Sequence, residues 1–179
     1  MDKLFEKKLT SKVIFQGKLL DVRSDKVLLP NGKIGNREYI NHPGAVCCVP
    51  ILNDGRVVLI NQYRYAVGRK VIELPAGKIN KNEKPEIAVV REVEEEIGFK
   101  SKDLILLTKI YPAVGFANEK MWIYMTRNLE KTVSKTDEDE FIQIMPVKFE
   151  KALSMVWDGI IKDAKSIIAL LHADKLLKQ

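Results

Sequence analysis

The strongest constraint on the fold is one predicted helix in the middle of the chain, over residues 86–97. Pro85 stands at its start and Gly98 just past its end, which is the usual placement of these residues at helix termini. With 3.6 residues per turn, its apolar side chains fall on one arc: Val89, Val90, Val93 and Ile97. A helix with one apolar arc needs a partner to cover it, so the chain must build a core against this helix.

Short apolar segments around the helix predict strands. We expect them at residues 44–52, 57–65, 71–74, 104–111, 121–126 and 141–145. Residues 44–52 and 57–65 are expected to form a central hairpin through the turn at 53–56. Two closing helices are expected at 148–157 and 163–177. The pattern predicts an α+β domain with helices packed on the faces of a strand-rich middle.

The first 40 or so residues predict a small β unit ahead of this domain. Asn31-Gly32 is a strong hairpin signal, and the flanking residues 12–29 and 37–40 are typical of strands. We therefore expect an N-terminal β unit over residues 1–42 and the main domain over 43–179.

Composition narrows the class of protein. The chain has 179 residues, of which 46% are hydrophobic and 30% charged, as in a globular protein. The net charge of +6 favours anionic partners. The sequence contains no basic stripe interleaved with aromatic residues, so it does not predict a nucleic-acid groove. Cys47 and Cys48 are adjacent in an apolar run, which predicts a reducing, cytoplasmic location without a disulfide framework. No apolar stretch is long enough to predict a membrane span.

Three glutamates gather on one stripe of the predicted helix: Glu92, Glu95 and Glu96. Like charges at these spacings destabilise a helix by a few tenths of a kcal/mol per pair, so a counter-charge is expected. A hard divalent cation such as Mg²⁺ takes carboxylate ligands and leaves positions for substrate phosphates. The alternative is a solvated acidic face on which Arg91 is a salt-bridge partner.

The spacing around these glutamates resembles the Nudix box, G-x5-E-x7-R-E-U-x-E-E-x-G-U, in which U is a bulky apolar residue. The matching residues are Gly77, Glu83, Arg91, Glu92, Val93, Glu95, Glu96, Gly98 and Phe99. The resemblance implies an α/β/α sandwich with a mixed sheet. It also implies an enzyme that hydrolyses a nucleoside diphosphate linked to another group. It further implies that Glu92 and Glu96 are the main metal ligands, with help from Glu95 and the Ala76 carbonyl. Arg91 would brace the acidic loop, and Mn²⁺ could replace Mg²⁺.

Other segments are similar to the ADP-ribose pyrophosphatase branch of that family. They are R-E-Y-I-N-H-P-G-A-V at 37–46, Q-Y-R at 62–64, E-L-P-A-G at 73–77, the acidic loop at 137–142 and G-I-I-K-D-A-K-S at 159–166. The resemblance implies a homodimer that hydrolyses ADP-ribose to AMP and ribose 5-phosphate. Ala113-Val114 replaces the Ser-Pro pair common in the branch, which leaves another nucleoside diphosphate sugar, such as a GDP-hexose, as an alternative. A non-catalytic nucleotide-binding module is the third hypothesis.

The resemblance also implies roles for residues outside the box. Arg64 suits a fork that binds phosphate, and Glu73 a contact with substrate or metal. Gly115 and Glu119 lie in a loop that reaches the substrate in the family.

Two further assignments leave alternatives open. Arg37 and Glu38 belong to the unit that, in the family, contributes to the partner subunit's adenosine pocket; a plain strand-edge ion pair is the alternative. A glutamate of the acidic loop acts on the water in the family, and we prefer Glu140 to Glu138 for this role.

Overall fold

The computed structural model describes residues 3–101, 103–134 and 140–179, which belong to two compact units. The first unit comprises Met1–Pro43 and Tyr111–Lys120, and the second comprises Gly44–Ile110 and Met121–Gln179. The loop Tyr111–Lys120 therefore groups with the N-terminal residues and not with the two strands that flank it in the sequence.

The larger unit contains strands β4 (Ala45–Pro50), β5 (Arg56–Arg64), β6 (Arg69–Glu73), β7 (Ala76–Lys78), β8 (Phe99–Lys100), β9 (Asp103–Ile110), β10 (Met121–Arg127), β11 (Glu130–Lys131) and β12 (Ile142–Lys148). One sheet has the order β7-β4-β10-β9 and another the order β12-β5-β6, while β8 pairs with β11. Strands β4 and β10 run parallel and their other pairings are antiparallel. The mixed sheet expected from the resemblance is confirmed.

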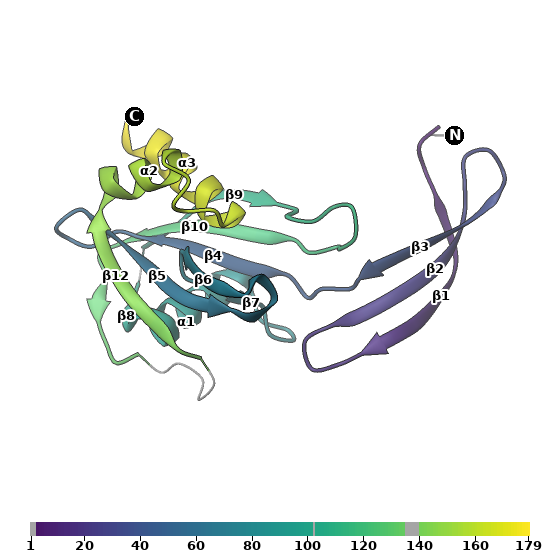
Figure 1. The fold of residues 1–179 in the computed structure, drawn as a ribbon, viewed down its shortest axis with the longest axis horizontal. Coiled ribbons are helices and arrows are strands. Elements are labelled where there is room, and N and C mark those ends of the chain that lie inside the picture. Colours follow the sequence, from purple (N-terminus) through teal and green to yellow (C-terminus); the bar gives the residue numbers. More distant parts are fainter. Residues whose placement is uncertain (1–2, 102, 135–139) are drawn as a thin grey trace. The chain divides into compact units, whose positions relative to one another are not determined.

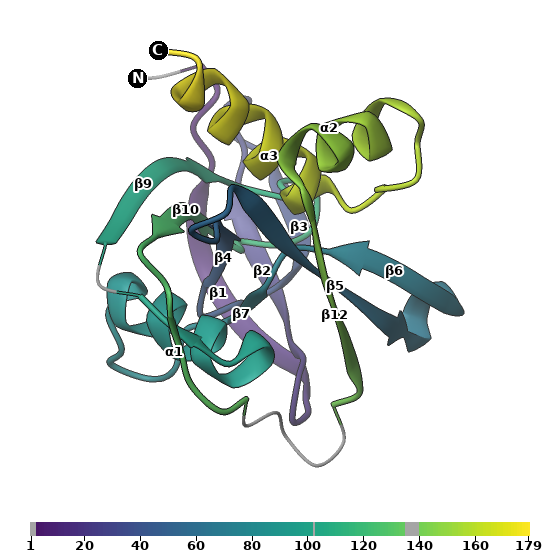
Figure 2. The same ribbon diagram turned by 90° about the vertical axis from the view of Figure 1, so that its left-hand side faces the viewer.

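Three α-helices enclose these strands: α1 (Pro85–Ile97), α2 (Phe149–Trp157) and α3 (Ala164–Leu177). Alternate side chains of β4 enter two different cores, with Val46 and Cys48 on the α1 side, and Cys47 and Val49 on the side of α2 and α3. Figures 1 and 2 show α1 on one side of the strands and α2 and α3 on the other. The larger unit is thus the expected α/β/α sandwich. In the parts of the chain that the structure describes, no helix is long and apolar enough to cross a membrane.

The central hairpin expected from residues 44–65 is wrong. The turn itself forms, with Gly55 at φ +82° and the Leu52 N–H donating to the Arg56 carbonyl at 2.8 Å. Beyond one bridge between Ile51 and Val57, however, β4 pairs with β7 and β10, and β5 pairs with β6 and β12. Both strands are apolar on both faces, so their side-chain pattern does not select a neighbour.

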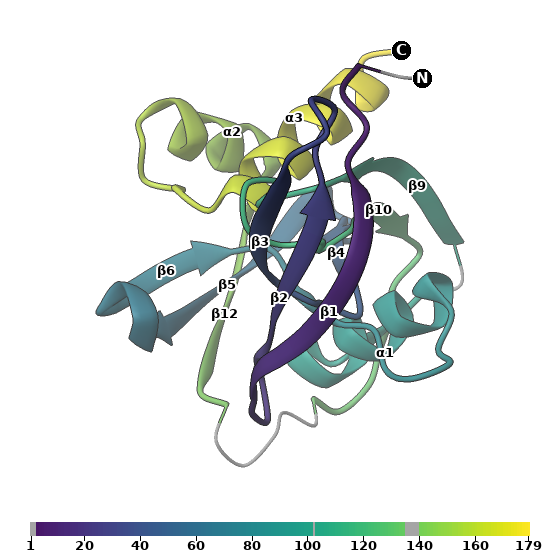
Figure 3. The ribbon, with the colours of Figure 1, turned by 90° about the vertical axis from the view of Figure 1, so that its right-hand side faces the viewer.

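The smaller unit contains an antiparallel sheet of three strands in the order β1-β2-β3 (Figure 3). These are β1 (Lys7–Gln16), β2 (Asp21–Leu28) and β3 (Ile34–Ile40). The expected turn at Asn31-Gly32 is confirmed, with Gly32 at φ +80°. A single strand over residues 12–29 is wrong, because the chain reverses where the Gly17 N–H donates to the Leu20 carbonyl.

Candidate active site

Helix α1 begins and ends where the sequence predicts. Pro85 is its first residue, and Gly98 follows it in the left-handed conformation, with its N–H donating to the Glu94 carbonyl at 3.0 Å. The buried apolar residues of the helix are Ala88, Val89, Val93 and Ile97. Glu96 is buried with them, at 3% exposure. The helix therefore carries a carboxylate into the protein as well as an apolar arc.

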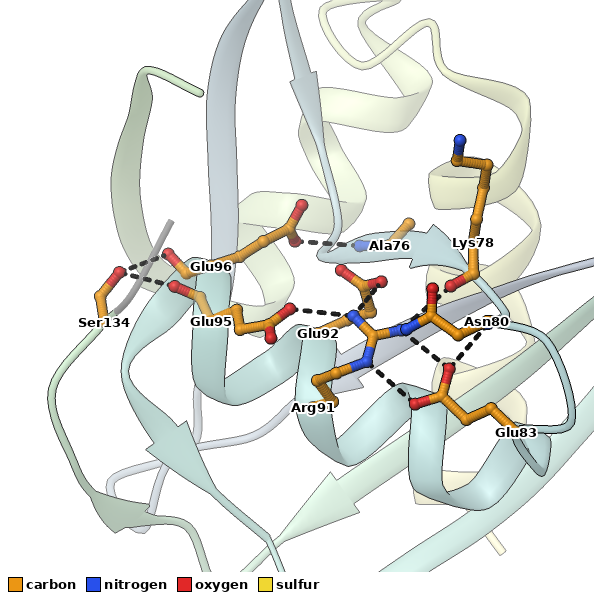
Figure 4. Close-up of polar contacts among 9 residues, drawn as sticks. All are labelled: Ala76, Lys78, Asn80, Glu83, Arg91, Glu92, Glu95, Glu96 and Ser134. Atoms are coloured by element: carbon orange, nitrogen blue, oxygen red, sulfur yellow. Dashed lines mark hydrogen bonds and ion pairs between the residues drawn. The ribbon is translucent and has the colours of Figure 1, made fainter. Parts of the chain in front are cut away.

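Arg91 joins the loop before the helix to the helix itself (Figure 4). Its Nε and Nη2 donate to the two oxygens of Glu83, at 2.9 and 3.0 Å. Its Nη1 donates to Glu92 at 2.7 Å and to Glu95 at 2.9 Å, and Nη2 also reaches the Lys78 carbonyl at 3.0 Å. The guanidinium holds the pKa of Glu83 below its usual range. This bracing depends on a planar fork with several N–H donors, which lysine lacks.

Glu92 lies directly against the backbone of Gly77 in β7. A Cβ at Gly77 would lie 2.0 Å from Cδ of Glu92, and 2.1 and 2.3 Å from its two oxygens. The pKa of Glu92 is raised, mainly by burial, although Arg91 acts in the opposite direction. Gly77 thus leaves the space that the Glu92 carboxylate occupies.

Glu96 meets the same strand one residue earlier. The Ala76 N–H donates to its Oε2 at 3.0 Å (Figure 4). Burial, followed by the nearby charges of Glu140 and Glu92, raises the pKa of Glu96 to about 9. Burial and the two neighbouring carboxylates thus outweigh the positive charge of Arg64, which acts in the opposite direction.

These residues suit a hard divalent cation. Burial disfavours ionisation of both Glu92 and Glu96, and a cation would reverse that effect. Carboxylate and carbonyl oxygens are ligands that Mg²⁺ and Mn²⁺ accept. Among the described residues, no three acidic, histidine or cysteine side chains already converge on one point. Glu92 and Glu95 each bind Arg91 through one oxygen, and Glu96 accepts from Ala76, so a cation could use the oxygens of Glu92 and Glu95 that Arg91 does not bind.

Glu140 stands just before β12 and, of the two acidic-loop candidates, is the one that the structure describes. It lines a hollow of about 530 Å³ with Gln62 and Tyr63 of β5. After burial, the negative charge of Glu140 is the largest cause of the raised pKa of Glu96. Glu140 therefore lies close enough to α1 to interact with it electrostatically. Glu138 lies outside the described residues.

Arg64 and Glu73 form a two-bond ion pair across β5 and β6. Arg64 Nε donates to Glu73 Oε1 at 2.7 Å and Nη2 donates to Oε2 at 2.9 Å. Lys165 of α3 also donates to Oε2. The positive charge of Arg64 acts to lower the pKa of Glu96. The structure therefore brings the expected phosphate fork within electrostatic reach of the acidic helix.

The four remaining candidates lie in the smaller unit. Arg37 of β3 forms two hydrogen bonds with Glu6, at 2.9 and 2.5 Å. Glu38 is exposed on the same strand. Gly115 has no other atom within 4 Å of the position that a Cβ would take, and Glu119 lies 4.0 Å from His42 Nδ1.

The sequence reasoning missed a polar cluster at the start of α3. Asp163 caps the helix by accepting the Ser166 N–H at 3.0 Å, and the Ser166 hydroxyl donates to the same carboxylate. The Ser166 oxygen accepts the Leu74 N–H at 2.7 Å. The spacing of Asp163 and Ser166 is typical of a helix start, but it does not reveal that Lys165 reaches Glu73.

Comparison with protein families agrees with this arrangement. The family described as "NUDIX domain" matches residues 41–169, and "Nucleoside diphosphate sugar hydrolase N-terminal domain" matches residues 6–40. The chain belongs to the Nudix family. The matched range of this Nudix protein includes Gly77 and helix α1 with its box glutamates and Arg91.

Individual relatives match nearly the whole chain. An "ADP-ribose pyrophosphatase" of Bacillus subtilis is 38% identical, over 96% of this chain and 94% of its own. A "Methanol dehydrogenase activator" of Bacillus methanolicus is 36% identical, over 96% of this chain and 95% of its own. A solved structure, "Crystal structure of ADP compounds hydrolase", is 25% identical with a TM-score of 0.87, and the match covers 99% of this chain and 97% of the other.

Proposed function

We propose that this protein hydrolyses the pyrophosphate bond of ADP-ribose and releases AMP and ribose 5-phosphate. The observation that carries the proposal is the buried Glu96 beside Glu92, two carboxylates on one helix whose charged forms are disfavoured by burial and would be stabilised by a cation. Such a site suits a metal-bound diphosphate. The similarity to an ADP-ribose pyrophosphatase along nearly the whole chain supports the choice of substrate.

We propose that Glu92, Glu95 and Glu96, with the Ala76 carbonyl, hold Mg²⁺, which Mn²⁺ can replace. Such an ion, when bound, neutralises charge that develops on the diphosphate and makes a coordinated water more acidic. The protein's own contribution is to keep the ligands together. Arg91 holds Glu92 and Glu95 near each other, and the Ser134 hydroxyl donates to the Glu95 carbonyl at 2.7 Å, which ties down the end of the helix.

We propose that Glu140, and not Glu138, accepts the proton of the attacking water. The electrostatic effect of Glu140 on Glu96 supports this role, since a base must lie within hydrogen-bond reach of the water in the substrate complex. Glu140→Gln should lower kcat with little change in the Mg²⁺ concentration needed for half-maximal rate. An unchanged kcat in this variant, with a loss in Glu138→Gln, would reverse the assignment.

We propose that Arg64 binds the diphosphate, that Arg37 and Glu38 contact the nucleoside bound by the partner subunit, and that the loop with Gly115 and Glu119 reaches the substrate. The exposure of Arg64 supports the first assignment, because its side chain is 41% exposed and its Nη1 is not used by Glu73, which binds Nε and Nη2.

We also propose a homodimer in which residues 1–42 provide the dimer contact and complete the substrate pocket. Strand β1 exposes apolar side chains that a second copy would cover, among them Leu9, Val13 and Phe15. An elution and light-scattering mass of twice 20.4 kDa is expected. A monomeric mass at assay concentrations would contradict it. The buried, unpaired thiols of Cys47 and Cys48 support a reducing, cytoplasmic location.

The decisive test is a substrate panel with purified protein and Mg²⁺. Alkaline phosphatase releases phosphate from AMP and ribose 5-phosphate, so phosphate formation reports hydrolysis of ADP-ribose. Glu96→Gln should abolish most turnover and keep the fold, whereas Glu94→Gln is the matched control. Glu94 is on the same helix at a variable position of the box, and in the part of the chain that the structure describes its side chain forms no ion pair. Stronger turnover of a GDP-hexose would favour the alternative substrate, and binding without turnover would favour a non-catalytic module.

A further inference from the structure

Glu73 is saturated by two cations of the protein itself. Arg64 uses both a Nε–H and a Nη2–H on its two oxygens, at 2.7 and 2.9 Å, and Lys165 donates to the second oxygen. The Glu73 side chain is 3% exposed. A metal ion or a substrate hydroxyl would have to displace one of these cations to reach it.

Lys165 is itself held in place by the start of α3. Its Nζ lies 3.0 Å from Asp163 Oδ1, and the other oxygen of Asp163 caps the helix. One residue later, Ser166 accepts the N–H of Leu74, the residue that follows Glu73. The first turn of α3 thus fixes both the Glu73 carboxylate and the backbone beside it.

Burial would disfavour the charged forms of this cluster, yet the cluster stays charged. The pKa of Glu73 is lowered by Arg64 and Lys165 despite the opposing and larger individual effect of burial. The pKa of Lys165 is raised by Asp163 and Glu73 against the same effect. Two cations and two carboxylates therefore balance, and Arg64 is the most exposed member, at 41%.

We propose that Glu73 and Lys165 are positioning residues that hold the Arg64 guanidinium toward its cavity, and that neither binds metal or substrate. The cavity has a volume of about 690 Å³, and its lining residues include Arg64, Glu73, Lys165 and Lys162. This inference rests on the proposed function, in which Arg64 binds the diphosphate. It replaces the expectation that Glu73 contacts substrate or metal.

The test compares Glu73→Gln, Lys165→Met and Lys165→Arg in steady-state kinetics at saturating Mg²⁺ and in Mg²⁺ titrations. We expect Glu73→Gln and Lys165→Met to raise KM by about tenfold or more, because small misplacements of a binding group are costly. The KM of Lys165→Arg should lie closer to the wild-type value than to that of Lys165→Met. The Mg²⁺ concentration for half-maximal rate should stay within about twofold of the wild-type value. A several-fold shift in that concentration for Glu73→Gln, with KM unchanged, would make Glu73 a metal ligand and overturn the proposal.

Two controls test whether the loss of charge alone explains the effect and whether Glu73 acts through Arg64. Lys162→Met removes a positive charge from the same cavity without touching Glu73, and an equal rise in KM would mean that charge alone is responsible. In an Arg64→Ala background, Glu73→Gln should add less than about twofold, because both variants remove the same interaction. An undiminished effect there would refute an action through Arg64.

A measurement without substrate keeps the two proposals distinguishable. The Arg64 Nε–H, assigned in an NMR spectrum with Arg64→Lys, should exchange slowly in wild type and Lys165→Arg and rapidly in Glu73→Gln. If wild type hydrolyses no member of the panel, the proposed function fails, and this proton alone decides whether Glu73 holds Arg64. Rapid exchange in the wild type would overturn the positioning role.

Discussion

Gly77→Ala should remove activity and leave the fold intact. The added Cβ would lie 2.0–2.3 Å from the Glu92 carboxylate, whereas non-bonded carbon atoms prefer about 3.5–4.0 Å. Gly77 is not among the glycines with positive φ, so alanine can adopt its backbone conformation. The obstructing atoms end a flexible side chain, and Glu92 can rotate away. The clash is therefore relieved by moving a proposed metal ligand and not by moving the strand.

Gly77→Ala should change the free energy of unfolding little and the catalytic rate strongly. Alanine is favoured over glycine within a strand by about 0.5–1 kcal/mol, and this offsets the loss of the partly exposed contact between Glu92 and Arg91. The free energy of unfolding should thus change by less than about 1 kcal/mol. Displacement of a group that stabilises developing charge costs about 10²–10³-fold in rate, and we expect kcat/KM to fall by that factor.

Gly98→Ala is the matched control from the same box. Gly98 has φ +68°, and a Cβ there would lie 2.9 Å from the backbone nitrogen of Ser134 and 3.3 Å from the Thr132 carbonyl oxygen. Left-handed backbone costs alanine about 1–2 kcal/mol, and backbone atoms cannot rotate away. This variant should lose stability, whereas Gly77→Ala should lose activity.

Urea unfolding and phosphatase-coupled turnover measure the two effects on the same preparations. Glu92→Gln should lose activity as Gly77→Ala does, and the double variant should lose little more, because both act on one carboxylate. Activity of Gly77→Ala within about threefold of wild type, or a loss of stability as large as that of Gly98→Ala, would refute the reasoning.

Three further predictions concern Ser166, Glu96 and Arg91. Ser166→Ala leaves the buried Leu74 N–H without its acceptor and should cost about 1–3 kcal/mol in urea unfolding, whereas Ser166→Thr keeps the hydroxyl. Burial and the charges of Glu140 and Glu92 raise the pKa of Glu96 from 4.5 to about 9, so the contribution of Glu96 to the stability of the metal-free protein should be full below about pH 4.5 and be lost as pH rises toward 9. Thermal unfolding in EDTA should show this loss as a difference in pH dependence between wild type and Glu96→Gln. Arg91→Lys cannot bridge the box carboxylates and should lower kcat/KM by about 10–100-fold, as other losses of ligand-orienting partners do.

The parts of the fold that the sequence predicts are those with local causes. Helix α1 was predictable because Pro85, Gly98 and the apolar arc act within one element. The pairing of β4 with β10 was not, because it joins segments about 75 residues apart and both strands are apolar on both faces. The reversal after Gly17 was missed because its sequence, Gly-Lys-Leu-Leu, contains one turn-forming residue only.

The candidate site divides in the same way. The glutamates of the box could be placed on one stripe by arithmetic on 3.6 residues per turn, and the ion pair between Arg91 and Glu95 follows from their i,i+4 spacing. The partner of Glu73 could not be found by spacing, because Lys165 lies 92 residues away. Ion pairs between distant residues leave no periodic pattern in a sequence. The prediction for Glu73 therefore came from the resemblance, which implies a contact with substrate or metal.

Arg64 and Arg91 of the larger unit differ in how much of their positive charge is already paired with carboxylates. Arg91 donates to three carboxylates, so little of its positive charge remains for an anion. Arg64 donates to one carboxylate, which it shares with Lys165, and its side chain is more exposed than that of Arg91, at 41% against 26%. The positive charge of Arg64 also reaches Glu96. A ligand that spans both must carry negative charge toward Arg64 and bind a cation toward Glu96, and a diphosphate meets both requirements because its oxygens accept guanidinium N–H bonds and coordinate Mg²⁺ at once.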